Sequence, residues 1–347
     1  IRRYDHEVQG TVVLKPLVGA SEIGPSDGGV IAPVTELNRG FVLSAGINPF
    51  YSLIDTYHMA ACCVDEAVRN AVTVGADPDY IALLDNFCWP DPVYDREKTP
   101  DGKYKLAQLV RAARGLYETA TGYGTPFISG KDSMKNDYKI GGHKVSVLPT
   151  ILVSAIGIVP NIRKCVSSDF KWPGDAIYLI GKTGRHLGQS FYYRKYGGSS
   201  GSVPIVDMGA NSRAYRAYFR AVEKELIESG HDLAEGGLAI AVAESCIAGA
   251  IGADIDLGLM SEVVELQDEE LLFSESAGRI LVSVSLTNEK EFRLVFRGIP
   301  HAKIGRVTGD GHLRIRGTAG EERALIDVNE LTGAYRSPLF SLLGMRM

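Results

Sequence analysis

The chain has 347 residues, of which 45% are hydrophobic and 23% charged, with 39 glycines and 15 prolines spread along it. This composition excludes disordered, coiled-coil and collagen-like classes, and the length predicts about two globular domains. The formal charge of -5 and the lack of a basic block argue against nucleic-acid binding, and no apolar stretch reaches the roughly 18 residues that a membrane span needs.

The five cysteines indicate a reducing environment. Their number is odd and none stands in CxxC spacing, so neither a disulfide framework nor a zinc site is predicted. The chain begins with Ile1, and its first residues contain no apolar signal segment. We therefore expect a cytoplasmic location and a piece excised from a longer protein.

In the first part of the chain, short Val- and Ile-rich runs alternate with two long helical patterns. Strands are expected over 10–16, 29–34, 39–44, 79–84 and 145–159. Helices are expected over 55–74 and 106–120. This exchange of strands and helices predicts an α/β or α+β layer architecture.

A domain boundary is expected within 160–174, where prolines, glycines and serines interrupt the pattern. Beyond it, strands are expected over 175–181, 279–284, 302–307 and 312–316, and helices over 212–228, 238–248 and 289–296. The glycine-rich end of 187–202 is expected to form a mobile surface loop. The tyrosines of segment 187–202 stand beside Arg194 and Lys195 and predict an exposed amphipathic edge.

Glu66 and Asn70 stand four residues apart in the first predicted helix. At this spacing their side-chain oxygens share one helical face, which suits the presentation of hard ligands to Mg²⁺. The ordinary alternative is a solvated pair. The small and apolar neighbours favour the functional interpretation, because they predict a largely buried helix in which a glutamate needs a partner.

The segment HDLAEGGL at 231–238 places Asp232 ahead of two glycines that open an apolar helix. Unpaired amide groups at a helix start bind phosphate, and an adjacent acid is a candidate metal ligand. The alternative is a simple N-cap by Asp232 or Glu235 followed by a tight glycine turn. Both interpretations stay open from these residues alone.

Three further segments combine polar residues with glycine or serine. In ISGKDSM at 128–134, Lys131 is suited to meet a phosphate, although the spacing is not that of a Walker P-loop. Asp27 lies in a glycine-rich segment, 24–30, that is also typical of a hairpin turn. The segment LFSESAGR at 272–279 suits either a helix cap or a ligand contact.

Taken in chain order, these segments resemble the later half of phosphoribosylformylglycinamidine synthase. The resemblance covers nearly the whole chain and rests on short motifs with similar separations. The motifs are YDHEVQG at 4–10, GPSD at 24–27, DEAVRN at 65–70, LDNF at 84–87, ISGKDS at 128–133, Asp232 with GGL at 236–238, and LFSES at 272–276.

This family shares a superfamily with aminoimidazole ribonucleotide synthase, selenophosphate synthetase and thiamine-monophosphate kinase, whose members bind ATP and magnesium. The resemblance implies an α+β fold. An AIR synthase-like N-terminal α/β domain, residues 1–165, would pair its sheet with a second copy into a barrel. An AIR synthase-like C-terminal α+β sandwich domain, residues 166–347, would follow it.

The resemblance also implies a carbon–nitrogen ligase of purine biosynthesis. In the family, ATP phosphorylates the amide oxygen of formylglycinamide ribonucleotide, and ammonia from glutamine displaces the phosphate to give the amidine. The implied partners are a nucleotide, the other half of the synthase or a second copy of this chain, and a glutaminase subunit or domain. Neither nucleic acid nor a membrane is expected as a partner.

At the positions that match the family's motifs, the resemblance implies a site for Mg²⁺ around bound ATP or ADP. The implied metal ligands are Asp27, Glu66, Asn70 and Asp232. The implied nucleotide contacts are Asp27, Lys131, Asp232, Gly236 and Gly237. Three carboxylates cannot lie close together in ionised form without a cation, which also favours a bound metal. Ala234 and Glu235 depart from the family, which has serine and aspartate there, and this departure puts a hydroxyl contact to the nucleotide in doubt.

The family's His-rich ETHNHP motif, glycine-rich phosphate loop and glutaminase cysteine elbow do not occur in these 347 residues. The chain alone is therefore not expected to be active, and its nucleotide is either catalytic or structural. Two alternatives remain. One is aminoimidazole ribonucleotide synthase or another ATP-binding member of the superfamily, and the other is a noncatalytic structural or interaction module.

Overall fold

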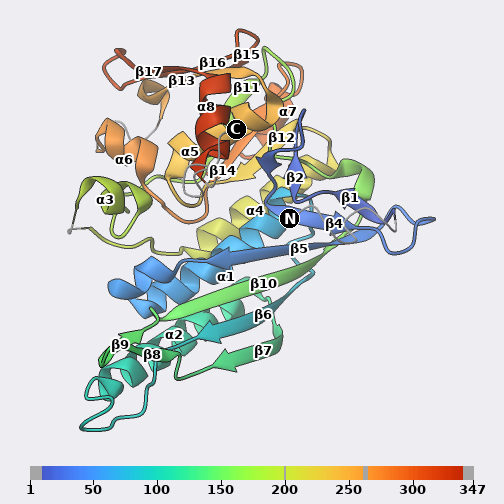
Figure 1. Ribbon diagram of the computed structural model, residues 1–347. Coiled ribbons are helices and arrows are strands. Elements are labelled where there is room, and N and C mark those ends of the chain that lie inside the picture. The colour runs from blue at the N-terminus through green and yellow to red at the C-terminus, as the bar shows by residue number, and fades with distance from the viewer. Residues whose placement is uncertain (1–9, 199–200, 261–264, 339–347) are drawn as a thin grey trace.

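The N-terminal domain is built on a six-stranded sheet. The computed structural model describes residues 10–198, 201–260 and 265–338, so motif residues 4–9 lie outside the described residues (Figure 1). The strands, in spatial order, are β1 (Val12–Leu14), β4 (Gly28–Ile31), β5 (Gly40–Ile47), β10 (Thr150–Val159), β6 (Ile81–Cys88) and β7 (Phe127–Ser133). Only the β6–β7 pair is parallel among them. Buried residues alternate along β5 and β10, so one face of the sheet is covered and the other is open.

Helix α1 (Thr56–Thr73) runs through the centre of the molecule (Figure 1). Asp55 caps it by accepting hydrogen bonds from the backbone N–H groups of Tyr57 and His58. All but two of its 18 residues are buried, because it contacts the sheet, helix α2 (Gly102–Tyr123) and helix α4 (Met208–Glu223). The predicted helix and its buried character are confirmed.

The C-terminal domain is a seven-stranded sheet with helices on both faces. Its strands, in spatial order, are β12 (Ser229–Asp232), β14 (Ile280–Val284), β11 (Ala176–Ile180), β15 (His301–Thr308), β13 (Gly252–Asp256), β16 (His312–Arg316) and β17 (Glu322–Asp327). Along β11, Tyr178 packs in the cluster that holds α4 and α7 (Glu289–Val295). Its neighbours Ile177 and Leu179 pack in the cluster that holds α5 (Gly237–Gly249) and α8 (Val328–Arg336). The predicted α+β sandwich is confirmed.

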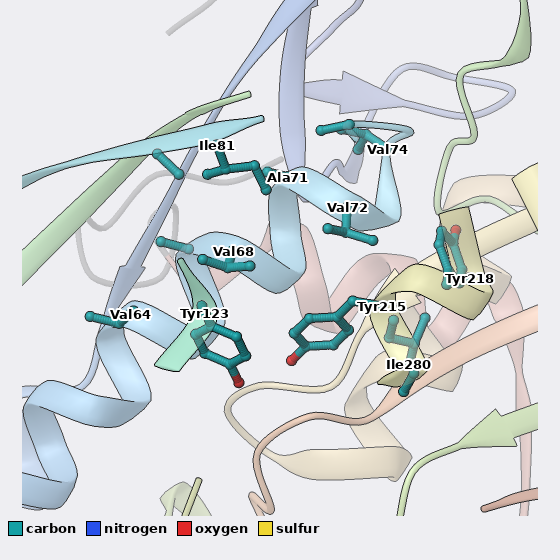
Figure 2. Packing of buried hydrophobic residues seen from close by; sticks show 14 of the residues in the cluster. Val64, Val68, Ala71, Val72, Val74, Ile81, Tyr123, Tyr215, Tyr218 and Ile280 are labelled. Atoms are coloured by element: carbon teal, nitrogen blue, oxygen red, sulfur yellow. The ribbon is translucent and has the colours of Figure 1, made fainter. Parts of the chain in front are cut away.

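The two domains share one continuous hydrophobic core (Figure 2). Val68 of α1 belongs to the same cluster as Tyr215 and Tyr218 of α4 and Ile280 of β14. Tyr123 of α2 stacks on Tyr215, with ring centroids 6.0 Å apart. Packing around α1 therefore fixes the two sheets relative to each other, and with them any site formed at their junction.

One predicted strand differs from the structure, and a helix within 187–202 was not predicted. The single strand over 145–159 is wrong: β9 (His143–Ser146) pairs with β8 (Asp137–Ile140), and β10 begins only at Thr150. Pro149 lies at this break, and a proline has no N–H to donate to a strand ladder. Segment 187–202 also contains helix α3 (Phe191–Tyr196), which Ser190 caps and which precedes the glycine-rich end. In the described part of the chain, every helix is too short or too polar to cross a membrane.

Candidate functional site

A cavity of about 760 Å³ opens where the two domains meet. Its polar lining comes from both of them: Asp27 immediately precedes β4, Glu66 and Asn70 lie on α1, and Asp232 ends β12. The glycine turn before α5 forms another part of the lining, and α3 and Phe273 form a third. The structure thus brings the four predicted metal ligands to one cavity.

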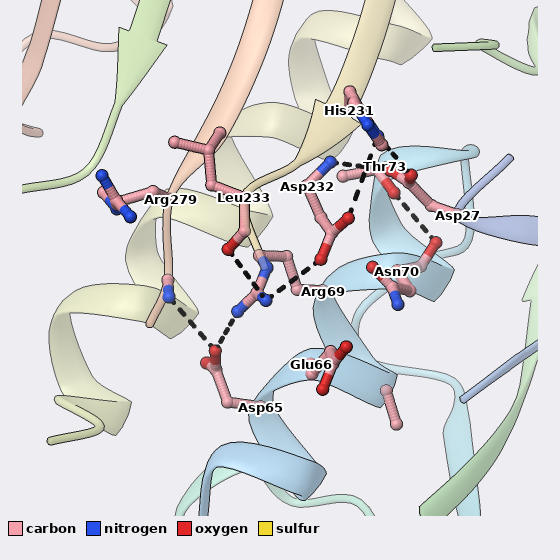
Figure 3. Close-up of polar contacts among 12 residues, drawn as sticks. Asp27, Asp65, Glu66, Arg69, Asn70, Thr73, His231, Asp232, Leu233 and Arg279 are labelled. Atoms are coloured by element: carbon pink, nitrogen blue, oxygen red, sulfur yellow. Dashed lines mark hydrogen bonds and ion pairs between the residues drawn. The ribbon is translucent and has the colours of Figure 1, made fainter. Parts of the chain in front are cut away.

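Asp27, His231 and Asp232 form a tight cluster, in which one ligand atom from each residue lies within 4.8 Å of the others (Figure 3). His231 Nδ1 lies 2.6 Å from Asp27 Oδ1, and the Asp232 backbone N–H donates to Asp27 Oδ2 at 2.8 Å. His231 Nε2 faces Oε2 of Glu244 at 3.1 Å. Burial would lower the pKa of His231, but the charges and hydrogen bonds of Asp27 and Glu244 outweigh it and hold this pKa well above 6.5. Both ring nitrogens thus face carboxylate oxygens, an arrangement that favours the protonated imidazole.

Glu66 is buried on the α1 face that meets β5. Its Oε2 accepts hydrogen bonds from Asn48 Nδ2 at 2.7 Å and from the Ile47 N–H at 3.1 Å. Burial, together with the negative charges of Glu235 and Asp232, raises the pKa of Glu66 well above its ordinary value. A cation bound near this carboxylate would favour its ionised form.

Asn70 lies one helical turn after Glu66 and has an unsatisfied side-chain atom. Its Nδ2 donates to the Ala45 carbonyl at 3.0 Å, which fixes the orientation of the amide. Its Oδ1 is buried and has no hydrogen-bond partner among the described residues. Because a buried acceptor without a partner is costly, this atom points to a bound group.

Arg69 connects the cavity to a buried carboxylate on α1 (Figure 3). It donates to Asp232 Oδ2 at 3.1 Å and also to Asp65. Burial and the Asp27 charge raise the pKa of Asp232 to about 6, while Arg69 and His231 oppose this rise. Arg69 and His231 thus place basic groups of the protein itself beside these carboxylates.

Gly236 and Gly237 form the turn that opens α5. Their φ angles of +78° and +62° lie in the left-handed region, and a Cβ on Gly237 would approach the Ser274 carbonyl oxygen to 2.5 Å. Gly236 is the N-cap, so a cap by Asp232 or Glu235 is ruled out. The Gly236 N–H donates to the Glu275 carboxylate and the Gly237 N–H to the Ala234 carbonyl, while the positive end of the helix favours a further anion nearby.

Helix α3 lines the cavity with Phe191, Tyr192, Lys195 and Tyr196, and the exposed edge predicted for this segment is confirmed, since Phe191 and Tyr196 are 51% and 69% exposed. Tyr192 stacks on Phe273, with centroids 4.6 Å apart and planes inclined by 13°. Pairs four residues apart, 191 with 195 and 192 with 196, share one helical face. That spacing is the only signal in the sequence that places these side chains together.

Lys131 lies outside the cavity. It is exposed on strand β7, at one end of the N-terminal sheet, where it pairs in register with Asn86 of β6. Strands β6 and β10 separate β7 from β5, whose Ala45 lines the cavity. The structure therefore does not bring Lys131 together with the other predicted nucleotide contacts.

Comparison with known protein families gives a match in each domain. Residues 25–159 match the family described as AIR synthase related protein, N-terminal domain. Residues 173–318 match AIR synthase related protein, C-terminal domain. The predicted division at residue 165 lies between the two matched segments and stays a prediction.

The chain is similar to the phosphoribosylformylglycinamidine synthase subunit PurL of Thermococcus sibiricus, with 33% identity over 345 residues, 99% of this chain and 44% of that protein. Its fold is similar to that of PurLQS from Thermotoga maritima, with a TM-score of 0.70, 20% identity and coverage of 91% of this chain and 47% of that one. It is also similar to T. maritima PurL complexed with ATP, with a TM-score of 0.64, 21% identity and coverage of 84% and 44%.

The chain spans about half the length of the relatives it matches. The resemblance to phosphoribosylformylglycinamidine synthase and the predicted fold class are both confirmed by these matches. Both domain matches occur in the expected order along one chain, around a cavity at their junction. The chain belongs to the AIR synthase related family.

Proposed function

We propose that the cavity between the domains binds a magnesium–nucleotide complex. The observation that carries this proposal is the buried Asn70 Oδ1, which has no partner among the described residues. It lines the same cavity as the carboxylates of Asp27, Glu66 and Asp232. Carboxylate and amide oxygens are the hard donors that Mg²⁺ prefers.

The residues of the cavity fit a divalent cation. Asp27, Asn70 and Asp232 would hold it, with Glu66 one turn before Asn70 on α1. Carboxylate oxygens that accept one hydrogen bond retain a second lone pair for a metal. His231 and Arg69 orient Asp27 and Asp232 through the contacts described above. The bound metal would neutralise the negative charge of the phosphates.

The nucleotide phosphates are assigned to the start of α5. The glycines of this turn allow the backbone to approach a ligand closely, and the positive end of the helix favours an anion. The aromatic face of α3 suits a flat ring, and Lys195 adds a positive charge. T. maritima PurL, a protein of the same fold, has been solved with ATP, which supports ATP or ADP as the nucleotide.

We further propose that the chain contributes this site to an ATP-dependent carbon–nitrogen ligase. The reaction is that of phosphoribosylformylglycinamidine synthase, with formylglycinamide ribonucleotide as substrate and ammonia from glutamine. The 33% identity over 99% of this chain supports the assignment. Because the chain spans 44% of that relative, the rest of the machinery is assigned to another half and to a glutaminase subunit or domain.

The open face of the N-terminal sheet is the surface that we assign to the other half or to a second copy. It exposes apolar side chains on its two central strands, with Leu43 and Ile47 on β5 and Ile156 and Ile158 on β10. Each of these four is at least 36% exposed. A contiguous apolar patch on a sheet face is typical of an interface.

Phosphate release from ATP, with formylglycinamide ribonucleotide and ammonium chloride present, tests the proposed reaction. We expect the chain alone to bind nucleotide without turnover, because phosphoryl transfer needs a positioned acceptor that half of the enzyme does not supply. The T. sibiricus subunit is the positive control, and its other half added to this chain is expected to restore some activity. Turnover by the chain alone at the rate of that subunit would contradict the proposal.

A further inference from the structure

Glu275 is a buried carboxylate that gathers three donors from separate parts of the chain. It is 4% exposed and lies between α6 (Asp268–Phe273) and β14. Its Oε1 accepts hydrogen bonds from the backbone N–H of Gly236 at 2.9 Å and of Phe191 at 3.0 Å. Its Oε2 accepts from the Tyr51 hydroxyl at 2.6 Å.

Two of these donors, Gly236 and Phe191, line the cavity, and the third lies in the N-terminal domain. Gly236 is the N-cap of α5, and Phe191 is the first residue of α3. Tyr51 lies in the short helix η1 (Pro49–Leu53) of the N-terminal domain. One carboxylate therefore links the glycine turn, the aromatic helix and the other domain.

Among the described residues, few other contacts hold α3 in place. It is six residues long, and Gly197 and Gly198 follow it. Its other contacts to neighbouring elements include the stacking of Tyr192 on Phe273 and the guanidinium of Arg194 over the Phe50 ring, 3.1 Å from its centroid. A helix this short is not stable by itself, so these tertiary contacts set its position.

The backbone around Glu275 is itself held in place. Arg279 is fully buried, and its guanidinium donates to the carbonyl oxygens of Ser276, at 3.0 Å, and of Ser274. The carbonyls on both sides of Glu275 are thus fixed by one rigid, planar group. This support makes the carboxylate a firm anchor for the segments that it binds.

We propose that Glu275 is a positioning residue that holds α3 and the glycine turn in the geometry that binds the nucleotide. The inference rests on the proposed function of the cavity. Glu275 is not among the described residues that line the 760 Å³ cavity, so it acts through Phe191 and Gly236. The proposed metal ligands lie on β12, on α1 and before β4, and among the described residues no hydrogen bond joins any of them to Glu275.

Glu275→Ala and Glu275→Gln test this role by titration with Mg-ATP and, separately, with Mn²⁺ alone. We expect Glu275→Ala to lose at least about tenfold in affinity for Mg-ATP and to stay within about twofold for Mn²⁺. Glu275→Gln keeps an oxygen that accepts from Gly236 and Phe191, and its amide donates to Tyr51, so it should stay within about threefold for both. Glu289→Ala is the matched control, since Glu289 accepts from a tyrosine hydroxyl, that of Tyr178, outside the cavity.

Three results would overturn the positioning role. The first is binding of Mg-ATP by Glu275→Ala with wild-type affinity. The second is an equal loss of Mn²⁺ and Mg-ATP affinity in that variant, which would indicate a general structural loss. The third is a Glu275→Gln variant that is as defective as Glu275→Ala. A wild-type chain that fails to bind Mg-ATP at all would overturn the proposed function of the cavity and the positioning role with it.

Discussion

Replacing Asp232 with asparagine is expected to weaken the binding of Mg-ATP by more than about tenfold, which corresponds to more than about 1.4 kcal/mol. The variant keeps the shape of the side chain but removes a negative charge from a position that is only 7% exposed. Arg69 stays behind as a cation 3.1 Å from the replaced group, and it would then oppose a divalent metal. Isothermal titration calorimetry with ATP in excess Mg²⁺, near neutral pH, measures the loss.

Asp254→Asn is the matched control for this variant. Asp254 is similarly buried, at 8% exposed, and pairs with Arg306 at 3.2 Å and Arg314 at 2.6 Å on the C-terminal sheet. Asp254 is not part of the cavity lining, so the Asp254→Asn variant should bind Mg-ATP with the affinity of the wild type. If Asp232→Asn also binds Mg-ATP with unchanged affinity, the assignment of Asp232 to the metal is wrong.

Replacing Asp65 with alanine is expected to destabilise the fold by about 3–5 kcal/mol. Asp65 is fully buried and accepts hydrogen bonds from Arg69, from the Tyr123 and Tyr215 hydroxyls, and from Asn211 Nδ2 at 2.9 Å. Its removal leaves several buried donors without an acceptor, and the Arg69 charge loses its neighbour on α1. Thermal unfolding should show a fall in Tm of at least about 5 °C.

Asp79→Ala provides the comparison for Asp65→Ala. Asp79 also pairs with an arginine, Arg216, at 2.6 Å, but both side chains are about half exposed. Exposed ion pairs contribute about 0–1 kcal/mol, so this variant should unfold close to the wild-type temperature. Equal stability of the two variants would show that the contacts of Asp65 do not hold the domains together.

Much of the fold follows from local sequence patterns. Helix α1 is predictable because Asp55 caps it, Gly75 follows it and its apolar residues are spaced for burial. Buried strands such as β11 and β14 are short Ile- and Val-rich runs bounded by breakers. Strand β12, with sequence SGHD, has no such run, and it forms because its backbone pairs with that of β14.

The candidate site is only partly predictable, because its contacts join residues far apart in the chain. Glu66 and Asn70 are found from their helical spacing. The ion pair of Arg69 with Asp232 joins positions 163 apart, and that of His231 with Asp27 joins positions 204 apart. No local pattern gives such pairs, so the protein's own cations at the site appear only in the three-dimensional structure.

A calorimetric titration of the wild-type chain with ATP, first in Mg²⁺ and then in EDTA, tests the central claim most directly. We predict binding in Mg²⁺ and none in EDTA, because Asp27 and Asp232 line the cavity and repel phosphate when no divalent cation lies between them. Equal affinity for ATP in both solutions would contradict a magnesium–nucleotide site in this cavity.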